Sequence, residues 1–239
     1  ICPCLKDIIS TYKKGTDFSI YMDTDGLIHA GSGLDQVTWM DVRVGDWVAT
    51  PRHGKPVEIN ALWYNALCTM DMLQARFGDN DDSYRQLASL VKASFNKRFW
   101  NENTGCLYDV VDEDDDTIRP NQIYAVSLPF TMLDREREKA IVDTVMDKLY
   151  VGCGLRSLDP DHKDYHPIYI GSLSKRDHAY HQGTAWGFLL GGFISAYVKV
   201  NGRTKATALC ADKLLEPVRE HLLNNCIGSI SVSYTHLTL

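Results

Sequence analysis

The amino-acid sequence predicts an all-α fold. About seven segments place apolar residues at helical spacing, and polar or aromatic loops join them. Strand-like patterning is confined to short stretches, so no large sheet is expected. No repeat at a fixed period is visible, which argues against a solenoid. Antiparallel helical hairpins packed as a bundle or barrel are therefore the expected architecture.

Five of these segments have clear helical periodicity. In the first, apolar residues from Ile59 to Phe77 recur at helical spacing, and Gly78 ends the run. Asp82 is placed to cap the second helix. Pro217 is expected to bend the last helix, because proline lacks the backbone donor that a continuous helix needs. In chain order, the predicted helices cover residues 56–77, 82–99, about 134–149, 182–200 and 203–225.

Two loops have a distinct composition. After a first short helix, residues 18–22 and 27–30 flank the turn sequence Asp23-Thr24-Asp25-Gly26, which predicts a β-hairpin. This hairpin is expected to decorate the helical fold. The acidic run at 112–116 lacks the ligand spacing of a calcium loop and is expected to be a solvated turn.

The composition excludes several classes of protein. With 44% hydrophobic and 23% charged residues, the chain has the profile of a soluble globular protein. No apolar run reaches the roughly 18–20 residues that cross a bilayer. A net charge of −6 argues against a nucleic-acid partner, whereas a neutral glucan is compatible with it. The seven cysteines include no CxxC pair, so we expect reduced thiols in a cytoplasmic protein, with no metal and no cofactor.

Four stretches combine carboxylates, amides, Arg and Trp, which are the side chains of a sugar site. Trp faces cover the apolar faces of a pyranose, while carboxylates, amides and Arg bond its hydroxyls. Three of the four stand immediately before or at the start of a predicted helix. Loops at one end of a helical array converge on one cavity. The stretches expected to line a single pocket are residues 38–41, 54–63, 119–122 and 180–186.

The same stretches carry a family resemblance. In chain order, the motifs are Thr38-Trp39-Met40-Asp41, Thr50-Pro51-Arg52, the segment from Gly54 to Leu67, Arg119-Pro120-Asn121-Gln122, Gly154-Leu155-Arg156 and Tyr180-His181-Gln182-Gly183-Thr184. This ordered set closely resembles the amylo-α-1,6-glucosidase family of glycogen-debranching enzymes. A single short motif such as Gly-Thr-x-Trp would be weak, because several helical-barrel glycosidases share it.

The resemblance implies an incomplete (α/α)6 toroid barrel with small β-hairpin insertions in its loops. It also implies a cytoplasmic glycosidase that removes, with inversion, the α-1,6-linked glucose at a branch point of glycogen or a branched α-glucan oligosaccharide. Inversion needs two carboxyl groups roughly 6.5–9.5 Å apart, and Asp41 matches the family's proposed general acid. The residues expected to bind substrate are Trp39, Glu58, Asn60, Trp63, Arg119, Asn121, Gln122, His181, Gln182 and Trp186.

The residues themselves leave structural roles open at several of these positions. Asp41 also fits a helix-capping role, and Glu58 at a helix start also fits the helix dipole. Trp63 belongs to an apolar stripe, which favours core packing over sugar stacking. His181 and Gln182 would be unremarkable as polar residues at the start of a helix.

One feature that the resemblance leads us to expect is missing. In the family, a stretch like Gly228-Ser229-Ile230-Ser231 continues into a Glu-containing motif that is the expected site of the general base. Here residues 232–239 follow, and no carboxylate side chain occurs after Glu220. The chain also begins with neither a start Met nor a signal sequence, which suggests a cut inside a larger protein. We therefore expect a partial barrel domain at 1–231, an atypical tail from a truncation or junction at 232–239, and no general base.

Three other functions remain open on the sequence alone. A glucan-binding fragment would hold sugar without cleaving it, and a helical interaction domain would bind no sugar at all. A glucoamylase-like or trehalase-like barrel would be separated from a debranching enzyme by comparing branched with linear oligosaccharides. The sequence leaves the oligomeric state open.

Overall fold

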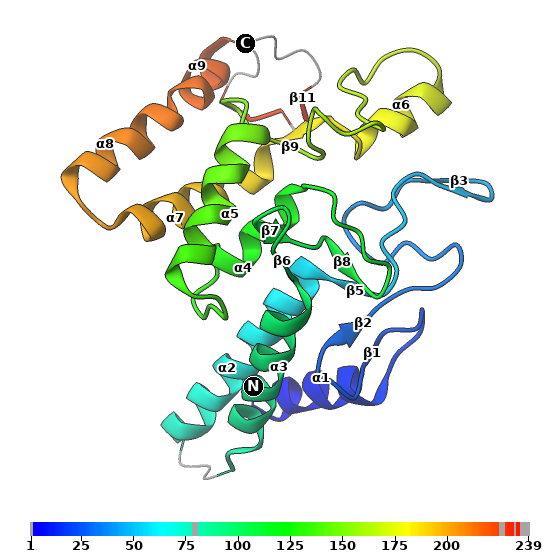
Figure 1. Ribbon diagram of the computed structural model, residues 1–239, viewed down its shortest axis with the longest axis vertical. Helices are drawn as coiled ribbons and strands as arrows, with labels where there is room; N and C mark the ends of the chain where they lie inside the picture. The colour runs from blue at the N-terminus through cyan, green and yellow to red at the C-terminus, as the bar shows by residue number, and fades with distance from the viewer. Residues whose placement is uncertain (1, 78–80, 225–227, 232, 235–239) are drawn as a thin grey trace.

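The computed structural model describes residues 2–77, 81–224, 228–231 and 233–234. Helices dominate these residues, as Figure 1 shows, and the all-α class is confirmed at the level of a mostly helical chain. The α-helices are α1 (Cys2–Lys14), α2 (Val57–Phe77), α3 (Ser83–Arg98), α4 (Tyr124–Ser127), α5 (Arg135–Lys148), α6 (Leu173–Tyr180), α7 (Leu190–Asn201), α8 (Lys205–Leu214) and α9 (Glu216–Asn224). Short 3-10 turns precede α4 and α7, at Pro120–Ile123 and Gly187–Leu189.

The strands in the described residues are two residues long and pair in small antiparallel ladders. β1 pairs with β2, β3 with β4, β5 with β8 and β6 with β7, while β10 lies between β9 and β11. They are β1 (Tyr21–Met22), β2 (Ile28–His29), β3 (Arg43–Val44), β4 (Trp47–Val48), β5 (Lys55–Pro56), β6 (Trp100–Asn101), β7 (Cys106–Leu107), β8 (Val110–Val111), β9 (Leu155–Arg156), β10 (Ala185–Trp186) and β11 (Ser233–Tyr234). Ladders this short connect loops to the helical core and form no extended sheet.

One hydrophobic core joins two groups of helices, which lie at the two ends of the long axis of the molecule. At one end α1 packs on α2, which lies against α3, and at the other α7 contacts α5 and α8 (Figure 1). The short helix α4 links the groups, because it contacts α2, α5 and α7. Fully buried apolar side chains from each group, such as Leu67, Phe95, Ile141 and Phe193, belong to one hydrophobic cluster. In the part of the chain that the structure describes, no helix is long and apolar enough to span a bilayer.

Several predicted elements are confirmed. The helices predicted at 56–77 and 82–99 are α2 and α3, each within one residue, and the helix near Asp134 is α5. The predicted hairpin is β1–β2, with Met22 opposite Ile28. Its first strand is shorter than expected, because Phe18 has a left-handed backbone conformation. Gly78, which was expected to end α2, lies outside the described residues.

The capping prediction for α3 is wrong. Asp82 lies at the N-cap position, but its side chain bonds no backbone amide of the helix. Its carboxylate accepts from the side chain of Gln86 instead. Asp134 caps α5 in the usual way, since its Oδ1 accepts from the amide of Arg137 at 2.9 Å.

The helix predicted at 182–200 starts too early. The structure places α7 from Leu190 to Asn201, because Ala185 and Trp186 pair instead with Arg156 and Leu155 as strand β10. Gly154 permits this pairing, since a Cβ there would lie 2.6 Å from the carbonyl oxygen of Trp186. A contact between distant segments therefore overrides the local helical pattern.

The last predicted helix divides in two. α8 ends at Leu214 and α9 begins at Glu216, directly before Pro217. Proline is tolerated in the first turn of a helix, where no intrahelical donor is needed, but it cannot continue one. The bend expected at this proline is therefore a break. Asn225 lies outside the described residues.

The acidic run at 112–116 is a largely exposed turn, as expected, and Asp115 is its half-buried member. Asp112 forms an ion pair with Arg98 and lies 3.5 Å from Nζ of Lys55, a lysine that is itself buried. Lys55 also bonds Asp23 and Asp25 at 2.8 and 2.9 Å, so it ties the β1–β2 turn to the start of α2. A buried ammonium needs such partners, because an unpaired charge in the interior is costly.

The two capping positions provide a matched test of helix stability. Asp134→Ala should lower the free energy of unfolding by about 1 kcal/mol, since it removes a hydrogen bond to an otherwise unpaired amide. Asp82→Ala should cost less than about 0.5 kcal/mol, because its side chain caps nothing. Urea unfolding followed by circular dichroism measures both values. Equal losses for the two variants would contradict the assignment.

Candidate active site

Three of the four predicted segments meet around the side chain of Trp39. The indole Nε1 donates a hydrogen bond to Oδ1 of Asn121 at 2.7 Å. The indole meets the rings of His181 and Trp186 edge-on, at 5.2 and 5.5 Å between ring centroids. The stretches 38–41, 119–122 and 180–186 are far apart in the sequence, and the fold brings them together.

The fourth segment joins through a buried ion pair. Glu58, in the first turn of α2, accepts from both terminal nitrogens of the Arg52 guanidinium, at 2.5 and 2.6 Å. Burial by itself lowers the pKa of Arg52, but the charges of Asp109 and Glu58 outweigh burial and raise it. The two hydrogen bonds join the two carboxylate oxygens to the two terminal nitrogens, which is the bidentate geometry of a strong ion pair. Glu58 is therefore committed to a structural pair.

Asp109 shares the same guanidinium and was missed in the sequence analysis. Its Oδ2 accepts from Nε of Arg52 at 2.6 Å, and its Oδ1 accepts from Nδ2 of Asn121 at 2.8 Å. Asp109 lies in the short link from β7 to β8, and its side chain is buried. A signal was available, since Asp109 is a single carboxylate between the apolar pairs 106–107 and 110–111. Such a residue needs a charged partner.

Arg119 braces the turn that follows α6. One terminal nitrogen donates to the backbone carbonyls of Ser157 and His181 at 3.1 and 2.9 Å, and the other donates to Oε1 of Gln182 at 2.8 Å. Burial lowers the pKa of Arg119, although the nearby Asp109 opposes that shift. Arg119 and Gln182, both predicted to bind substrate, bond each other here.

His181 is a neutral imidazole inside the cluster. Its residue is 1% exposed, and its Nδ1 has no hydrogen-bond partner among the described residues. Burial lowers the pKa of His181 to about 3, and the positive charges of Arg119 and Arg52 add to that shift. His181 follows the end of α6, so it is not the helix-start residue that the sequence suggested.

Aromatic rings form an open wall beside this buried network. Phe188 is 54% exposed and meets Trp39 edge-on at 5.1 Å between ring centroids. Tyr180 packs against Trp186 at 4.9 Å. Phe188 was not predicted, although its position two residues after Trp186 was a signal. The exposed ring of Phe188 suits the apolar face of a sugar, whereas Trp186 is 6% exposed and packs inside the wall.

Asp41 directly follows Trp39 and Met40, which belong to the buried network. The preceding residue, Met40, is buried, and its sulfur lies 3.8 Å from Arg119 and 3.7 Å from Asn121. Asp41 itself is exposed. Its charge adds to burial in raising the pKa of Tyr180, which places the carboxylate near that phenol. No helix begins at Asp41, so the alternative capping role is wrong.

Three of the residues predicted to bind substrate make structural hydrogen bonds. Asn60 is completely buried and bonds both backbone groups of Ile28, at 2.7 and 3.1 Å. Trp63 donates to a carbonyl oxygen of the β1–β2 turn at 3.0 Å. Gln122 accepts from a backbone amide of β7 at 3.3 Å. These partners account for the polar atoms that the sequence analysis assigned to sugar.

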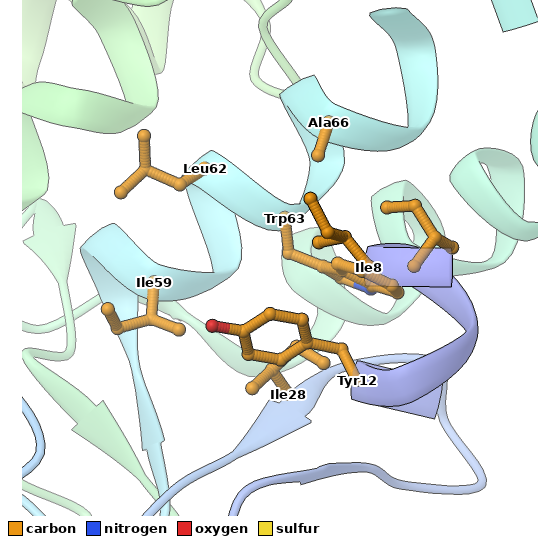
Figure 2. A pocket seen from close by; sticks show the side chains of 8 residues that line it. Ile8, Tyr12, Ile28, Ile59, Leu62, Trp63 and Ala66 are labelled. Carbon is orange, nitrogen blue, oxygen red and sulfur yellow. The ribbon is translucent and has the colours of Figure 1, made fainter. Parts of the chain in front are cut away.

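Trp63 faces an apolar cavity between α1 and α2. Figure 2 shows its indole beside Ile8 and the ring of Tyr12, and the two ring centroids lie 6.4 Å apart. The cavity has a volume of about 230 Å³ and is lined by Ile8, Ile9, Tyr12, Ile28, Ile59, Leu62, Trp63 and Ala66. Its lining contains no carboxylate and no side-chain amide, so it lacks the chemistry of a sugar site.

Comparison with known proteins relates this geometry to a family. The family described as amylo-alpha-1,6-glucosidase matches residues 1–236. The chain belongs to the amylo-alpha-1,6-glucosidase family. This family member is 28% identical, over 233 aligned residues, to the glycogen debranching enzyme of Saccharomyces cerevisiae (strain ATCC 204508 / S288c). The alignment covers 77% of this chain and 15% of that enzyme, so the chain spans a small part of its relative.

Solved structures of two other enzymes resemble the fold of this amylo-alpha-1,6-glucosidase family member. A GH63 mannosylglycerate hydrolase from Thermus thermophilus, in complex with glucose, matches with a TM-score of 0.56 and 14% identity, covering 77% of this chain and 40% of that one. The neutral trehalase of Saccharomyces cerevisiae has the same TM-score and identity, covering 76% of this chain and 34% of that one. Identities this low show a shared fold, and the family match shows a glycosidase family.

The described residues of this amylo-alpha-1,6-glucosidase family member contain no metal-binding cluster. No group of three or more His, Cys, Asp or Glu side chains among them could hold a metal ion. Among the cysteines whose side chains the structure describes, Cys4, Cys68, Cys106 and Cys210 are free thiols.

The lowered pKa of His181 gives a pH dependence with a defined sign. The unfolded chain, with an ordinary histidine pKa of about 6.5, binds more protons than the folded chain between pH 6.5 and about 3. The stability that the neutral ring contributes is thus present above pH 6.5 and is lost as the pH falls. The difference in free energy of unfolding between the chain and His181→Gln should shrink by about 1.4 kcal/mol per pH unit below 6.5. Urea unfolding from pH 7.5 to 4.5 tests this, and a constant difference would contradict it.

Proposed function

We propose that this chain is the acid-bearing and sugar-binding part of a glycoside hydrolase that removes α-1,6-linked glucose at the branch points of glycogen. One observation carries the proposal: the exposed Asp41 follows directly on Trp39 and Met40, which are anchored in the buried network, and lies beside an open aromatic wall. A carboxyl group next to a sugar-stacking surface is the arrangement that protonation of a glycosidic oxygen needs.

In the proposed reaction, Asp41 donates its proton to the bridging oxygen as the bond from that oxygen to the anomeric carbon breaks. A water molecule attacks the same carbon from the opposite face, and a second carboxylate takes its proton. The products are free glucose with inverted configuration and the trimmed glucan. Trp39 and Phe188 supply the stacking surface, and the buried Trp186 supports it from behind.

The second carboxylate is not Glu58 or Asp109. Arg52 holds both carboxylates within the protein interior, and a base must face the water that it deprotonates. No carboxylate side chain follows Glu220 in the 239 residues. We therefore assign the base to the Glu-containing motif that follows the Gly-Ser-Ile-Ser-like stretch in the family.

We further propose that residues 1–231 are one part of an (α/α)6 toroid. Consecutive helical hairpins, such as α2 with α3, are the unit from which such a toroid is built. The family match extends to residue 236, and β11 pairs with β10. Residues 232 and 235–239 lie outside the described residues, so the expected boundary at 231 stays a prediction.

Two alternatives to this function can be tested, one by ligand binding and one by turnover. A trehalase-like specificity is favoured by the structural likeness to a neutral trehalase, and a glucan-binding role without turnover is compatible with the missing base. Tryptophan fluorescence with isomaltose, maltose and trehalose tests the trehalase-like specificity, because Trp39 and Trp186 lie in the wall. Glucose release by a form extended through the family's Glu-containing motif tests the role without turnover. Preference for isomaltose, which has the α-1,6 bond, supports the proposal.

The role of Asp41 predicts a large loss of turnover. In a form of the protein extended through the family's Glu-containing motif, Asp41→Asn should fold normally and lower kcat by about 10²–10⁴-fold, the usual contribution of a general acid. Glucose release from a singly branched limit dextrin measures the loss with an unactivated leaving group. Asp46→Asn, a change of the same charge at another exposed position of this loop, is the control and should retain activity. Near-normal kcat for Asp41→Asn would refute the role.

The 239 residues by themselves should release glucose far more slowly than the extended form. Without a carboxylate on the water side of the sugar, the attacking water keeps its proton and the inverting step is slow. The same limit dextrin and equal protein concentrations provide the comparison. Equal rates would show that a base lies within these residues and would refute its assignment to the family's Glu-containing motif.

A further inference from the structure

Asp109 lies at the centre of a chain of buried hydrogen bonds that ends at Trp39. Nε of Arg52 donates to Oδ2 of Asp109 at 2.6 Å, and Nδ2 of Asn121 donates to its Oδ1 at 2.8 Å. Oδ1 of Asn121 then accepts from Nε1 of Trp39 at 2.7 Å. Asp109 is 2% exposed, and none of the motifs that identify the family contains it.

The donors and acceptors in this chain allow a single orientation of the Asn121 amide. The carboxylate of Asp109 has two accepting oxygens, and one of them, Oδ2, already accepts from Nε of Arg52. The indole nitrogen of Trp39 can only donate. The amide between them must therefore turn its NH2 toward Asp109 and its oxygen toward Trp39. Reversing it would place a donor against a donor and an acceptor against an acceptor.

The backbone of Asp109 is also held on both sides. Its amide donates to the carbonyl oxygen of Asp115 at 2.8 Å, and its carbonyl oxygen accepts from the amide of Val57 at 3.0 Å. Val57 is the first residue of α2, so the carboxylate is held against a long helix. A group anchored in this way can determine the orientation of its neighbours.

We propose that Asp109 is a positioning residue, which orients the Asn121 amide and through it the indole of Trp39, two residues before Asp41. The inference rests on the proposed function in taking Trp39 as part of the surface that faces sugar. Asp109 touches neither substrate nor the reacting atoms, and it acts by determining where that surface lies.

Asp109→Asn isolates this role because it keeps the shape of the side chain. The new amide has one accepting oxygen and one donating NH2 group, but both of its partners, Arg52 and Asn121, are donors. One donor must then face another, or the Asn121 amide must turn over and lose its bond to Trp39.

Exchanging the two residues restores each hydrogen bond. In the double variant Asp109→Asn/Asn121→Asp, the amide at position 109 accepts from Arg52 through its oxygen and donates through its NH2 to the carboxylate at 121. The other oxygen of that carboxylate accepts from Trp39. Asn121→Asp by itself places two carboxylates against each other. Of the two single variants and the double variant, it should bind isomaltose most weakly.

The experiment uses the whole 239-residue chain and two readouts. The indole NH signal of Trp39 in ¹H–¹⁵N spectra, assigned with Trp39→Phe, reports the hydrogen bond directly. Isomaltose affinity, from tryptophan fluorescence, reports the position of the wall. Asp109→Asn should shift the indole signal and weaken isomaltose binding by about tenfold, the effect of one lost buried hydrogen bond. The double variant should return the Trp39 indole signal to its original position. It should also bring isomaltose affinity to within about threefold of that of the original chain.

Asp116→Asn is the matched control, because it makes the same change of charge at an exposed position of the neighbouring loop. An unchanged indole signal in Asp109→Asn would overturn the proposal. So would a double variant that is no closer to the original chain than Asp109→Asn, including one that does not fold. If the chain binds no isomaltose, the proposed function fails, while the indole signals still decide whether Asp109 positions Trp39.

Discussion

The guanidinium of Arg52 is buried, and its charge has to be balanced inside the fold. Removing an unpaired charge from water costs several kcal/mol, so Arg52 is compatible with this interior because Glu58 and Asp109 lie against it. Glu58 belongs to α2, whereas Asp109 lies between β7 and β8. One side chain therefore ties together two parts of the chain that are distant in sequence, and the Asn121–Trp39 contact is built on that tie.

This buried network divides the candidate site into two kinds of residue. Polar side chains inside it, such as Arg119 and Gln182, bond each other or the backbone and hold the turn after α6 in place. The residues on its open side, Asp41 and Phe188, have few polar partners among the described residues and are exposed. A glycosidase needs both, because a proton donor is effective only when a rigid surface holds the sugar against it.

The same network explains the state of His181. Two guanidinium groups and deep burial disfavour the imidazolium, so the ring remains neutral and packs as an aromatic surface against Trp39 and Trp186.

Periodicity alone was sufficient to predict α2, α3 and α5, since an apolar stripe at helical spacing indicates which face of a helix is buried. The position of the polar stretches at the starts of predicted helices also predicted that the segments containing Trp39, Asn121 and His181 would meet. Tertiary structure decided the rest. The start of α7 depends on strand pairing with residues 155–156, and Asp109 was missed because its partners are 57 and 12 positions away. The role of a carboxylate depends on the groups that face it, and a linear pattern does not contain those groups.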